Sequence, residues 1–434
     1  MKERTKDQIK RTIILTAVLM LLGFAVMLFC EWRGNLSDSL SACRQMIFLM
    51  PVFAVLAGMA HYHAGKELGI GEYIRQIFCG KSMPEGRKTY LDHARIFAAI
   101  MVILTHACAM QADVEAALWK TNLLRICTGI GLVCNPLYVM ISGSLLLSDK
   151  KEESLGTFYF KRFVKVVLPM VVYYVIFLGV SGQISLIPPK NLEEGVRQIL
   201  AGASGIVPHY WLIYTLISLY ITAPFMRIMV KNLKDSHITV LFFLILTEEC
   251  IAIWLPLTGV QIGFAMNLAS WEGVFLLGYI LTERRMKWME RFVLIFGGIS
   301  AAVIGFIMVW DHSFKEYVCN TAPAMVLFAG AVLVALSGLD GKLNGKSPIV
   351  TQMLSKYSYS IILVHWYGLF VVTWGKIGIQ PLRFGCIGGI ALTVFTAFTV
   401  CLILGFAVEN TIVRGVQYIV NSLRHIVAVI GHFS

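Results

Sequence analysis

Residues 90–110 read YLDHARIFAAIMVILTHACAM, a largely apolar stretch that opens on charged residues and ends just after a histidine. About 20 apolar residues are enough to cross the hydrocarbon core of a membrane as one helix. Comparable runs recur along the chain, which has 434 residues, 57% of them hydrophobic and only 14% charged. An average soluble domain is about one quarter charged. The composition therefore excludes an ordinary soluble enzyme and predicts an all-α, polytopic membrane protein.

Apolar runs bounded by charges or turn residues predict twelve membrane-spanning helices. Their approximate ranges are 12–30, 44–63, 91–110, 127–148, 163–181, 209–229, 237–256, 268–282, 292–310, 322–339, 357–375 and 384–408. With the N-terminus inside, 27 of the 37 Lys and Arg residues fall in cytoplasmic segments, nine fall in outer loops, and Arg95 lies within a span. Such an excess follows the positive-inside rule. We therefore expect both termini to be cytoplasmic and the net charge of +12 to reflect topology rather than a nucleic-acid partner.

The chain divides into three predicted regions. Residues 1–87 hold two N-terminal spans and a cytoplasmic loop, residues 88–410 form a ten-helix core, and residues 411–434 form a tail. The tail has apolar residues at helical spacing, which is typical of an amphipathic helix on a membrane surface. The ten cysteines include no C-x-x-C pair and no Cys/His cluster, so no metal is expected. Cys43 and Cys319 fall in predicted outer loops, where they could pair.

The span at 91–110 places two ionisable side chains on one helix face. Arg95 and His106 are eleven residues apart, which corresponds to three helical turns plus about 20° and to about 16 Å along the axis. Ionisable residues within a bilayer are costly and often functional. Plainer explanations are that Arg95 pairs with Asp92 or extends to the membrane surface, and that His106 is a packed, hydrogen-bonded residue.

Several segments in this order resemble the membrane-bound acyltransferase 3 family, which includes bacterial O-acetyltransferases of surface polysaccharides and peptidoglycan. Asp92-x-x-Arg95 followed by His106 resembles the family's Arg-x10-His signature. The other matching segments are Pro136 to Ser142-Gly143, the basic stretch Phe158 to Lys165, the aromatic His209-x-Trp211 segment and the late helix from Tyr357 to His365. The resemblance covers about residues 88–408.

The resemblance implies an enzyme of the inner or plasma membrane that takes an acyl group, most simply acetyl, from cytoplasmic acyl-CoA. Basic groups suit the CoA phosphates because Arg and Lys bind phosphate by charge and hydrogen bonds. Lys161, Arg162 and Lys165, together with Ser142, are the expected CoA-binding residues, although the three cations could equally be topology charges. His106 would be the general base, or carry the acyl group itself, with Arg95 and Asp92 completing the catalytic set.

The acceptor implied by the resemblance is a hydroxyl group of a cell-surface or lipid-linked glycan on the outer face. The candidate acceptor-binding residues on that side are Glu248, Glu249, His209, Trp211, Tyr214 and His365. The two glutamates could instead be buried, hydrogen-bonded carboxylates, and the aromatic residues could belong to the interfacial belt.

Two other functions remain open from the sequence. Twelve spans with both termini inside is also a layout of small-solute transporters. Alternatively, because no soluble transferase domain follows the core in this chain, the protein could relay acyl groups to a separate secreted transferase.

Overall fold

The computed structural model describes residues 52–53, 55–63, 70–80, 88–112, 114, 116–148, 153–186, 189–203, 205–261, 263, 266–284, 286–339 and 348–430, together with Ile14 and Val18. Apart from these last two residues, the first predicted span lies outside this part of the chain, as does most of 44–54. Residues 55–63 are helical, as the second predicted span requires.

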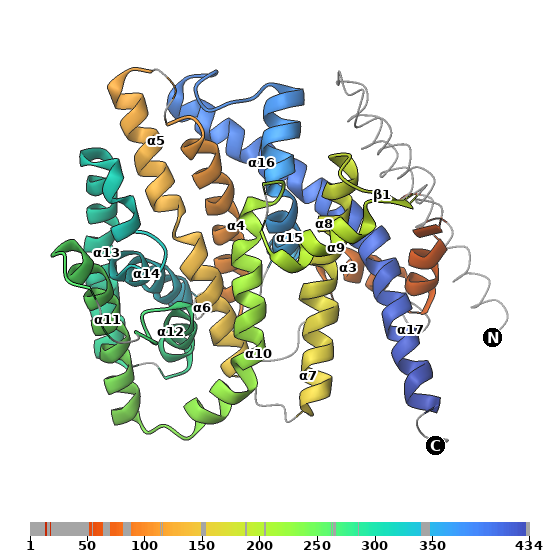
Figure 1. Cartoon of the computed structure of the whole chain (residues 1–434), viewed down its shortest axis with the longest axis horizontal. Helices are drawn as coiled ribbons and strands as arrows, with labels where there is room; N and C mark the ends of the chain where they lie inside the picture. Colours follow the sequence, from red (N-terminus) through yellow and green to blue (C-terminus); the bar gives the residue numbers. More distant parts are fainter. Residues whose placement is uncertain are drawn as a thin grey trace.

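The described chain is almost entirely helical (Figure 1). The helices are α3 Ile70–Cys79, α4 Tyr90–Ala109, α5 Leu118–Gly131, α6 Cys134–Leu147, α7 Leu155–Arg162, η1 Phe163–Val167, α8 Leu168–Val180, α9 Leu192–Ala201, η2 Pro208–Tyr210, α10 Trp211–Lys231, α11 Asp235–Leu257, α12 Trp271–Glu283, α13 Lys287–Trp310, η3 His312–Tyr317, α14 Pro323–Leu339, α15 Ile349–Trp366, η4 Tyr367–Ile377, α16 Cys386–Val408, η5 Glu409–Val413 and α17 Arg414–Ile430. One antiparallel ladder pairs β1 (Ser185–Leu186) with β2 (Pro189–Lys190).

Each of the ten spans predicted between residues 91 and 408 has a helical counterpart. Within the described chain, eight helical segments are long and apolar enough to cross a membrane, and Pro323–Gly338 is a shorter apolar helix. Their outer faces carry large exposed side chains such as Ile295, Phe306 and Phe395, which are 60%, 64% and 71% exposed. Aliphatic and aromatic faces of this kind suit a surrounding of lipid. The chain is an all-α, multi-pass membrane protein.

Three predicted spans start eight or nine residues later than the helices that correspond to them. The spans expected at 163–181 and 357–375 correspond to helical segments that begin at Leu155 and Ile349. The span expected at 127–148 starts nine residues earlier, at Leu118, so Lys120 and Arg125 lie on α5 rather than in a loop. The expectation was wrong because it treated the two charges as the end of the span, whereas a helix can continue past charges near a membrane surface. The structure also contains α3, a short helix inside the segment expected to be only a cytoplasmic loop.

Glycines determine how closely the central helices approach one another. A methyl group at Gly143 of α6 would collide with the Phe275 carbonyl of α12, and one at Gly278 of α12 would collide with the Met140 carbonyl of α6. Small residues at such crossings let two backbones touch, which is a common way of packing helices in membranes. The contact holds α6, and with it Ser142, firmly against the middle of the bundle.

The 13-residue helix α12 is enclosed by its neighbours. Every residue from Gly273 to Thr282 is buried, and α12 packs against α6 over most of its length. A lipid-facing span needs about 20 residues, but α12 does not meet lipid along this segment. Its short length is therefore compatible with a position inside the membrane.

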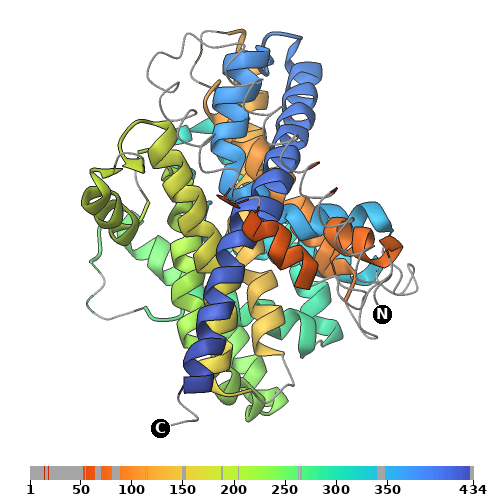
Figure 2. The same ribbon diagram turned by 90° about the vertical axis from the view of Figure 1, so that its right-hand side faces the viewer.

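The last two spans contain π-helical segments. α15 continues through η4, and α16 continues through η5 into α17. Figure 2 shows α16 and α17 as a long helix that runs from the top of the view almost to its base. The tail expected from residue 411 onward is thus helical as far as Ile430.

Candidate active site

The start of α4 holds a buried ion pair. Asp92 is fully buried, and its Oδ1 accepts from Arg95 Nη1 at 3.2 Å and from Ser355 Oγ of α15 at 2.7 Å. The Arg95 side chain keeps 27% of its surface exposed. The simpler prediction of an Asp92–Arg95 pair is therefore confirmed, and the pair also ties α4 to α15.

His106 lies near the other end of α4, against the end of α15. Its ring stacks on His365, with centroids 5.1 Å apart and planes inclined by 24°. The Trp366 ring meets the same imidazole edge to face at 5.4 Å. Because α4 is an unbroken helix from Tyr90 to Ala109, Arg95 and His106 share one face, as their spacing predicted.

A third histidine joins this pair from η2. The His209 ring lies 4.5 Å from the His365 ring, centroid to centroid, and stacks with Trp366 at 5.9 Å. His209 Nε2 donates to the Leu363 carbonyl at 3.2 Å, and the Tyr210 hydroxyl donates to the same oxygen at 3.3 Å. The sequence singled out each histidine separately, and the fold brings all three together. We call His106, His209 and His365 the histidine cluster.

Backbone contacts define the protonation of two of these rings. His365 Nδ1 lies 2.7 Å from the Ile362 carbonyl oxygen. Because a carbonyl only accepts, the contacting nitrogens of His365 and His209 carry protons, so in the neutral rings His365 Nε2 and His209 Nδ1 are acceptors. Neither acceptor nitrogen has a hydrogen-bond partner among the described residues. Both rings are buried, whereas His106 is partly exposed and is the accessible member of the cluster.

The histidine cluster is not built like a metal site. Among the described residues, no group of three or more His, Cys, Asp or Glu side chains could hold a metal ion. His106 and His365 lie face to face, so their nitrogens do not converge on a common point as metal ligands do.

A second group of charges surrounds Phe158 on α7. The guanidinium carbons of Arg162 and Arg227 lie 5.1 and 5.4 Å from the centroid of this ring, within the range of a cation–π interaction. Arg227 Nε also donates to the Leu146 carbonyl at 2.8 Å. The sequence does not distinguish Arg227 from the other charges near span ends, so its position beside Arg162 was not predicted. Lys161 forms an ion pair with Glu153.

Ser142 connects this cationic group with α4. Its hydroxyl lies 3.1 Å from the Tyr220 hydroxyl of α10. Arg95 and Arg162 both lie close enough to Tyr220 to interact electrostatically with it. The predicted residues Arg95, Ser142 and Arg162 therefore gather around one tyrosine, although they come from α4, α6 and α7.

The other predicted acceptor residues have more varied surroundings. Glu248 accepts from the Leu268 backbone N–H at 2.8 Å, and the Tyr214 hydroxyl donates to the Ile199 carbonyl at 2.5 Å. Trp211 packs against Trp271 at 5.6 Å. Glu249 is buried, and neither of its carboxylate oxygens has a hydrogen-bond partner among the described residues. Among the described residues, no hydrogen bond or ion pair joins Glu248 or Glu249 to the histidine cluster.

Glu409 is a polar residue that sequence reasoning missed. It begins η5 and accepts from the Ser360 hydroxyl of α15 at 3.3 Å. The only available signal was a single carboxylate after the apolar run of the last predicted span, which marked the end of that span rather than a site. π-Helical turns in α-helices occur often at functional positions.

Comparison with known families gives one match. A family model described as an acyltransferase domain, Acyl_transf_3, matches residues 88–408. The matched region begins just before α4 and ends with α16, so it contains the whole histidine cluster and the cations around Phe158. No curated protein and no solved structure matches the chain.

Proposed function

This chain belongs to the membrane-bound acyltransferase 3 family, and on that premise we propose that it transfers an acetyl group from cytoplasmic acetyl-CoA to a hydroxyl group of a cell-surface or lipid-linked glycan. The main support is the accessible His106 ring, held by His365 and Trp366 on the same helix face as Arg95. A basic group at one end of a helix and an imidazole about 16 Å away suit a donor that spans part of the membrane.

The proposal includes a topology and a location. We infer that the protein has twelve spans and that both termini are cytoplasmic. We also infer that it lies in the inner or plasma membrane. The 27-to-9 division of Lys and Arg between alternate segments supports this orientation. In this orientation α7 and its cations begin on the cytoplasmic side, and the histidine cluster lies in the outer half of the bundle.

Acyl-CoA would enter beside α7. Arg162 and Arg227, which flank Phe158, can bind phosphate by charge and by hydrogen bonds from the planar guanidinium. Lys165 is exposed nearby, whereas Lys161 is engaged with Glu153 and would contribute less. The Ser142–Tyr220 pair then offers hydroxyl groups to the polar part of the pantetheine arm.

The reaction requires one proton acceptor. An unprotonated nitrogen of His106 takes the proton of the acceptor hydroxyl as its oxygen attacks the thioester carbonyl. The carbon–sulfur bond breaks, the acetyl group becomes an ester of the glycan, and the CoA thiolate takes up the proton from the imidazolium. His365 and Trp366 restrict the orientation of the His106 ring, so the imidazole is held ready for this transfer.

The glycan acceptor would be held on the side of His106 that faces away from the CoA-binding cations. His209 and His365 are buried, so they would assist acceptor binding by orienting His106 rather than by touching the sugar. Trp211, which follows η2 directly and is partly exposed, could pack against a sugar ring. Glu248, Glu249 and Tyr214 stay predictions for acceptor binding, since Glu248 and Tyr214 already bond to backbone groups.

The proposal is tested with the purified protein in liposomes. Acetyl-CoA with a labelled acetyl group is supplied on the side of α7, a panel of hydroxyl-bearing glycans is supplied on the other side, and label on the glycan and free CoA are both measured. Equal amounts of acetylated glycan and released CoA are expected with at least one glycan. Acetyl-CoA that stays intact with every glycan, in a protein that still shows cooperative unfolding, would contradict the function.

A further inference from the structure

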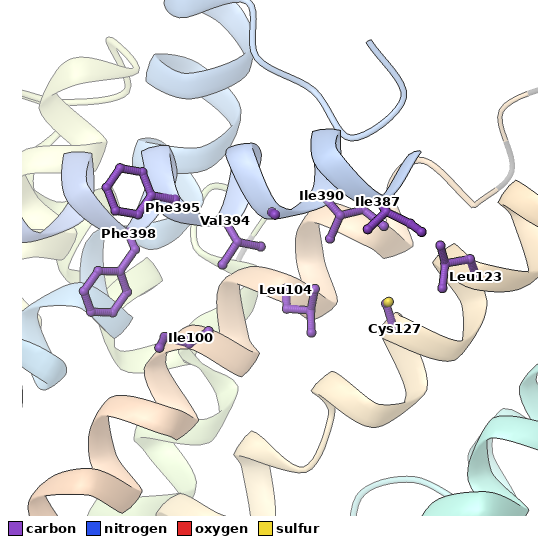
Figure 3. A pocket seen from close by; sticks show the side chains of 10 residues that line it. Ile100, Leu104, Leu123, Cys127, Ile387, Ile390, Val394, Phe395 and Phe398 are labelled. Atoms are coloured by element: carbon purple, nitrogen blue, oxygen red, sulfur yellow. The ribbon is translucent and has the colours of Figure 1, made fainter. Parts of the chain in front are cut away.

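We propose that a cavity between α4, α5 and α16 binds one hydrocarbon chain of an anionic membrane lipid, whose phosphate-bearing headgroup lies against Lys120. The cavity has a volume of about 580 Å³, which is within the range of small-molecule sites. Figure 3 shows side chains of all three helices pointing toward it, among them Ile100, Leu104, Leu123, Cys127, Val394 and Phe398. This site is independent of the proposed acyl transfer.

The lining of the cavity fits a hydrocarbon chain. Nine of the ten lining side chains contain only carbon, and the exception is the Cys127 thiol. The three helices belong to segments long and apolar enough to cross a membrane. Ile387 and Phe395, which line the cavity on α16, are each 71% exposed. The cavity therefore opens toward the surrounding bilayer, and the molecules that reach it from there carry acyl chains.

Positive charge at one end of the cavity selects the headgroup. Lys120 precedes the lining residue Leu123 by about one helical turn on α5. The Cys386 thiol, at the start of α16, lies 4.0 Å from the Lys120 carbonyl oxygen, and Arg383 precedes Cys386 by three residues on the exposed loop. α5 and α16 also both begin at this end, where helix N-termini carry partial positive charge. A basic group beside an apolar cleft between membrane helices attracts an anionic lipid headgroup by its charge.

The lipid would not be the acyl acceptor. Leu104 and His106 are two residues apart on α4, so their side chains point about 200° apart around the helix axis. The cavity and the reactive ring therefore lie on opposite sides of α4. A chain in the cavity would contact α4, α5 and α16 together and would fill the space behind the helix that carries His106.

The lipid site is tested by counting retained lipids. The full-length protein is placed in nanodiscs of phosphatidylglycerol or phosphatidylcholine with identical acyl chains, gently delipidated, and weighed by native mass spectrometry. We expect one phosphatidylglycerol to be retained and phosphatidylcholine to be retained at least about fivefold less. Leu104→Trp, which fills the cavity, and Lys120→Ala, which removes the cation, should each lower phosphatidylglycerol retention by a similar factor.

Matched variants control for general effects on the membrane surface. Ile295→Trp on the exposed face of α13 and Lys190→Ala in the segment before α9 should leave retention unchanged, as should His106→Ala. Equal retention of the two lipids, or phosphatidylglycerol retention that survives either test variant, would overturn the proposal.

If Leu104→Trp does not fold, a bilayer-soluble maleimide provides a second measurement on the unmodified protein. The labelling rate of Cys127 is obtained by subtracting the rate measured for Cys127→Ser. This rate should be slower in phosphatidylglycerol than in phosphatidylcholine, and equal rates in the two lipids would also overturn the proposal.

Discussion

His106 of α4 and His365 of α15 stack ring on ring, 5.1 Å apart, at opposite ends of the region that matches the acyltransferase family. The contact joins the first helix of the core to one of its last. Because His365 also hydrogen-bonds to its own helix through the Ile362 carbonyl, it holds the face of His106 without occupying the nitrogens of that ring. His106 is thus oriented and still free to exchange a proton.

The first prediction concerns His106. His106→Ala should lower acetyl transfer by about two to four orders of magnitude, the usual contribution of a general base. His106→Gln should be almost as inactive, because an amide can keep a hydrogen bond but cannot accept a proton near neutral pH. Transfer of labelled acetyl is the measurement, with thermal unfolding as a control for folding. His237→Ala, at an exposed histidine on α11, should keep full activity, and a well-folded, active His106→Ala protein would refute the mechanism.

The second prediction separates Arg162 from Lys161. Arg162→Ala should raise the KM for acetyl-CoA by about 10- to 100-fold, which corresponds to the loss of one charged hydrogen bond, and should change kcat much less. Lys161→Ala should have a smaller effect because Lys161 is half exposed and pairs with Glu153. Initial rates over a range of acetyl-CoA concentrations check this order. Equal effects of the two substitutions would mean that only net charge matters at this end of α7.

The third prediction concerns the buried Asp92 carboxylate. Ser355→Ala removes one of its hydrogen-bond donors and should destabilise the protein by about 1–3 kcal/mol. Arg95→Lys should also lower activity, because an ammonium group cannot reproduce the planar guanidinium. Thermal unfolding of Ser355→Ala is compared with that of Ser218→Ala, an exposed serine of α10. Indistinguishable unfolding temperatures would show that Asp92 does not depend on the contact with α15.

The fourth prediction uses two adjacent glycines of α13. A methyl group at Gly297 would collide with the Leu327 carbonyl and the Ala331 side chain of α14, whereas one at Gly298 would meet nothing within 4 Å. Gly297→Ala should therefore destabilise the protein by about 1–3 kcal/mol through overpacking. Gly298→Ala should be neutral or stabilise by up to about 1 kcal/mol, since alanine favours a helix. Unfolding measurements that rank the two variants in the opposite order would contradict the α13–α14 contact.

The fifth prediction concerns topology. The segments near Lys81, Lys151, Arg285 and Lys346, which lie outside the described residues, should be cytoplasmic. In intact cells, and with Cys43 replaced by Ser because it falls in a predicted outer loop, an impermeant maleimide should label Lys190→Cys and not Lys346→Cys. Native Cys319 should add little background, because it is 4% exposed and burial raises the pKa of its thiol to about 12. The thiol stays protonated at pH 7 to 9, and labelling of Lys346→Cys from outside would invert the proposed orientation from that point on.

The positions of the helices along the chain were predicted more completely than the contacts between them. Hydropathy alone located a helix in each of the ten segments predicted between residues 91 and 408, and the eleven-residue spacing correctly placed Arg95 and His106 on one face of α4. It could not show that His209 and His365 meet His106, because contacts between α4, η2 and α15 depend on packing between segments far apart in the chain. For the same reason, Arg227 looked like any other charge at a span end until the fold placed it beside Phe158.

Two other differences arose because charged residues were taken to mark the end of a lipid-facing span. The early start of α5 was missed because Lys120 and Arg125 were taken to end the span. Glu409 was taken as the end of an apolar run, although η5 continues the helix and places the partly buried carboxylate beside Ser360. Local sequence patterns describe what a helix tolerates in lipid, and they do not describe which polar partners its neighbours supply.

The enclosure of α12 has a consequence for how the protein is made. A helix of 13 residues is too short to be held across a bilayer by its own contacts with lipid. Its buried Gly278 fits against Met140 of α6, which is synthesised earlier. We therefore expect α12 to enter the membrane after α6 during biosynthesis. Its stable insertion should depend on contact with α6. A substitution that separates the two helices, such as Gly278→Leu, should reduce the yield of inserted protein before any step of catalysis is affected.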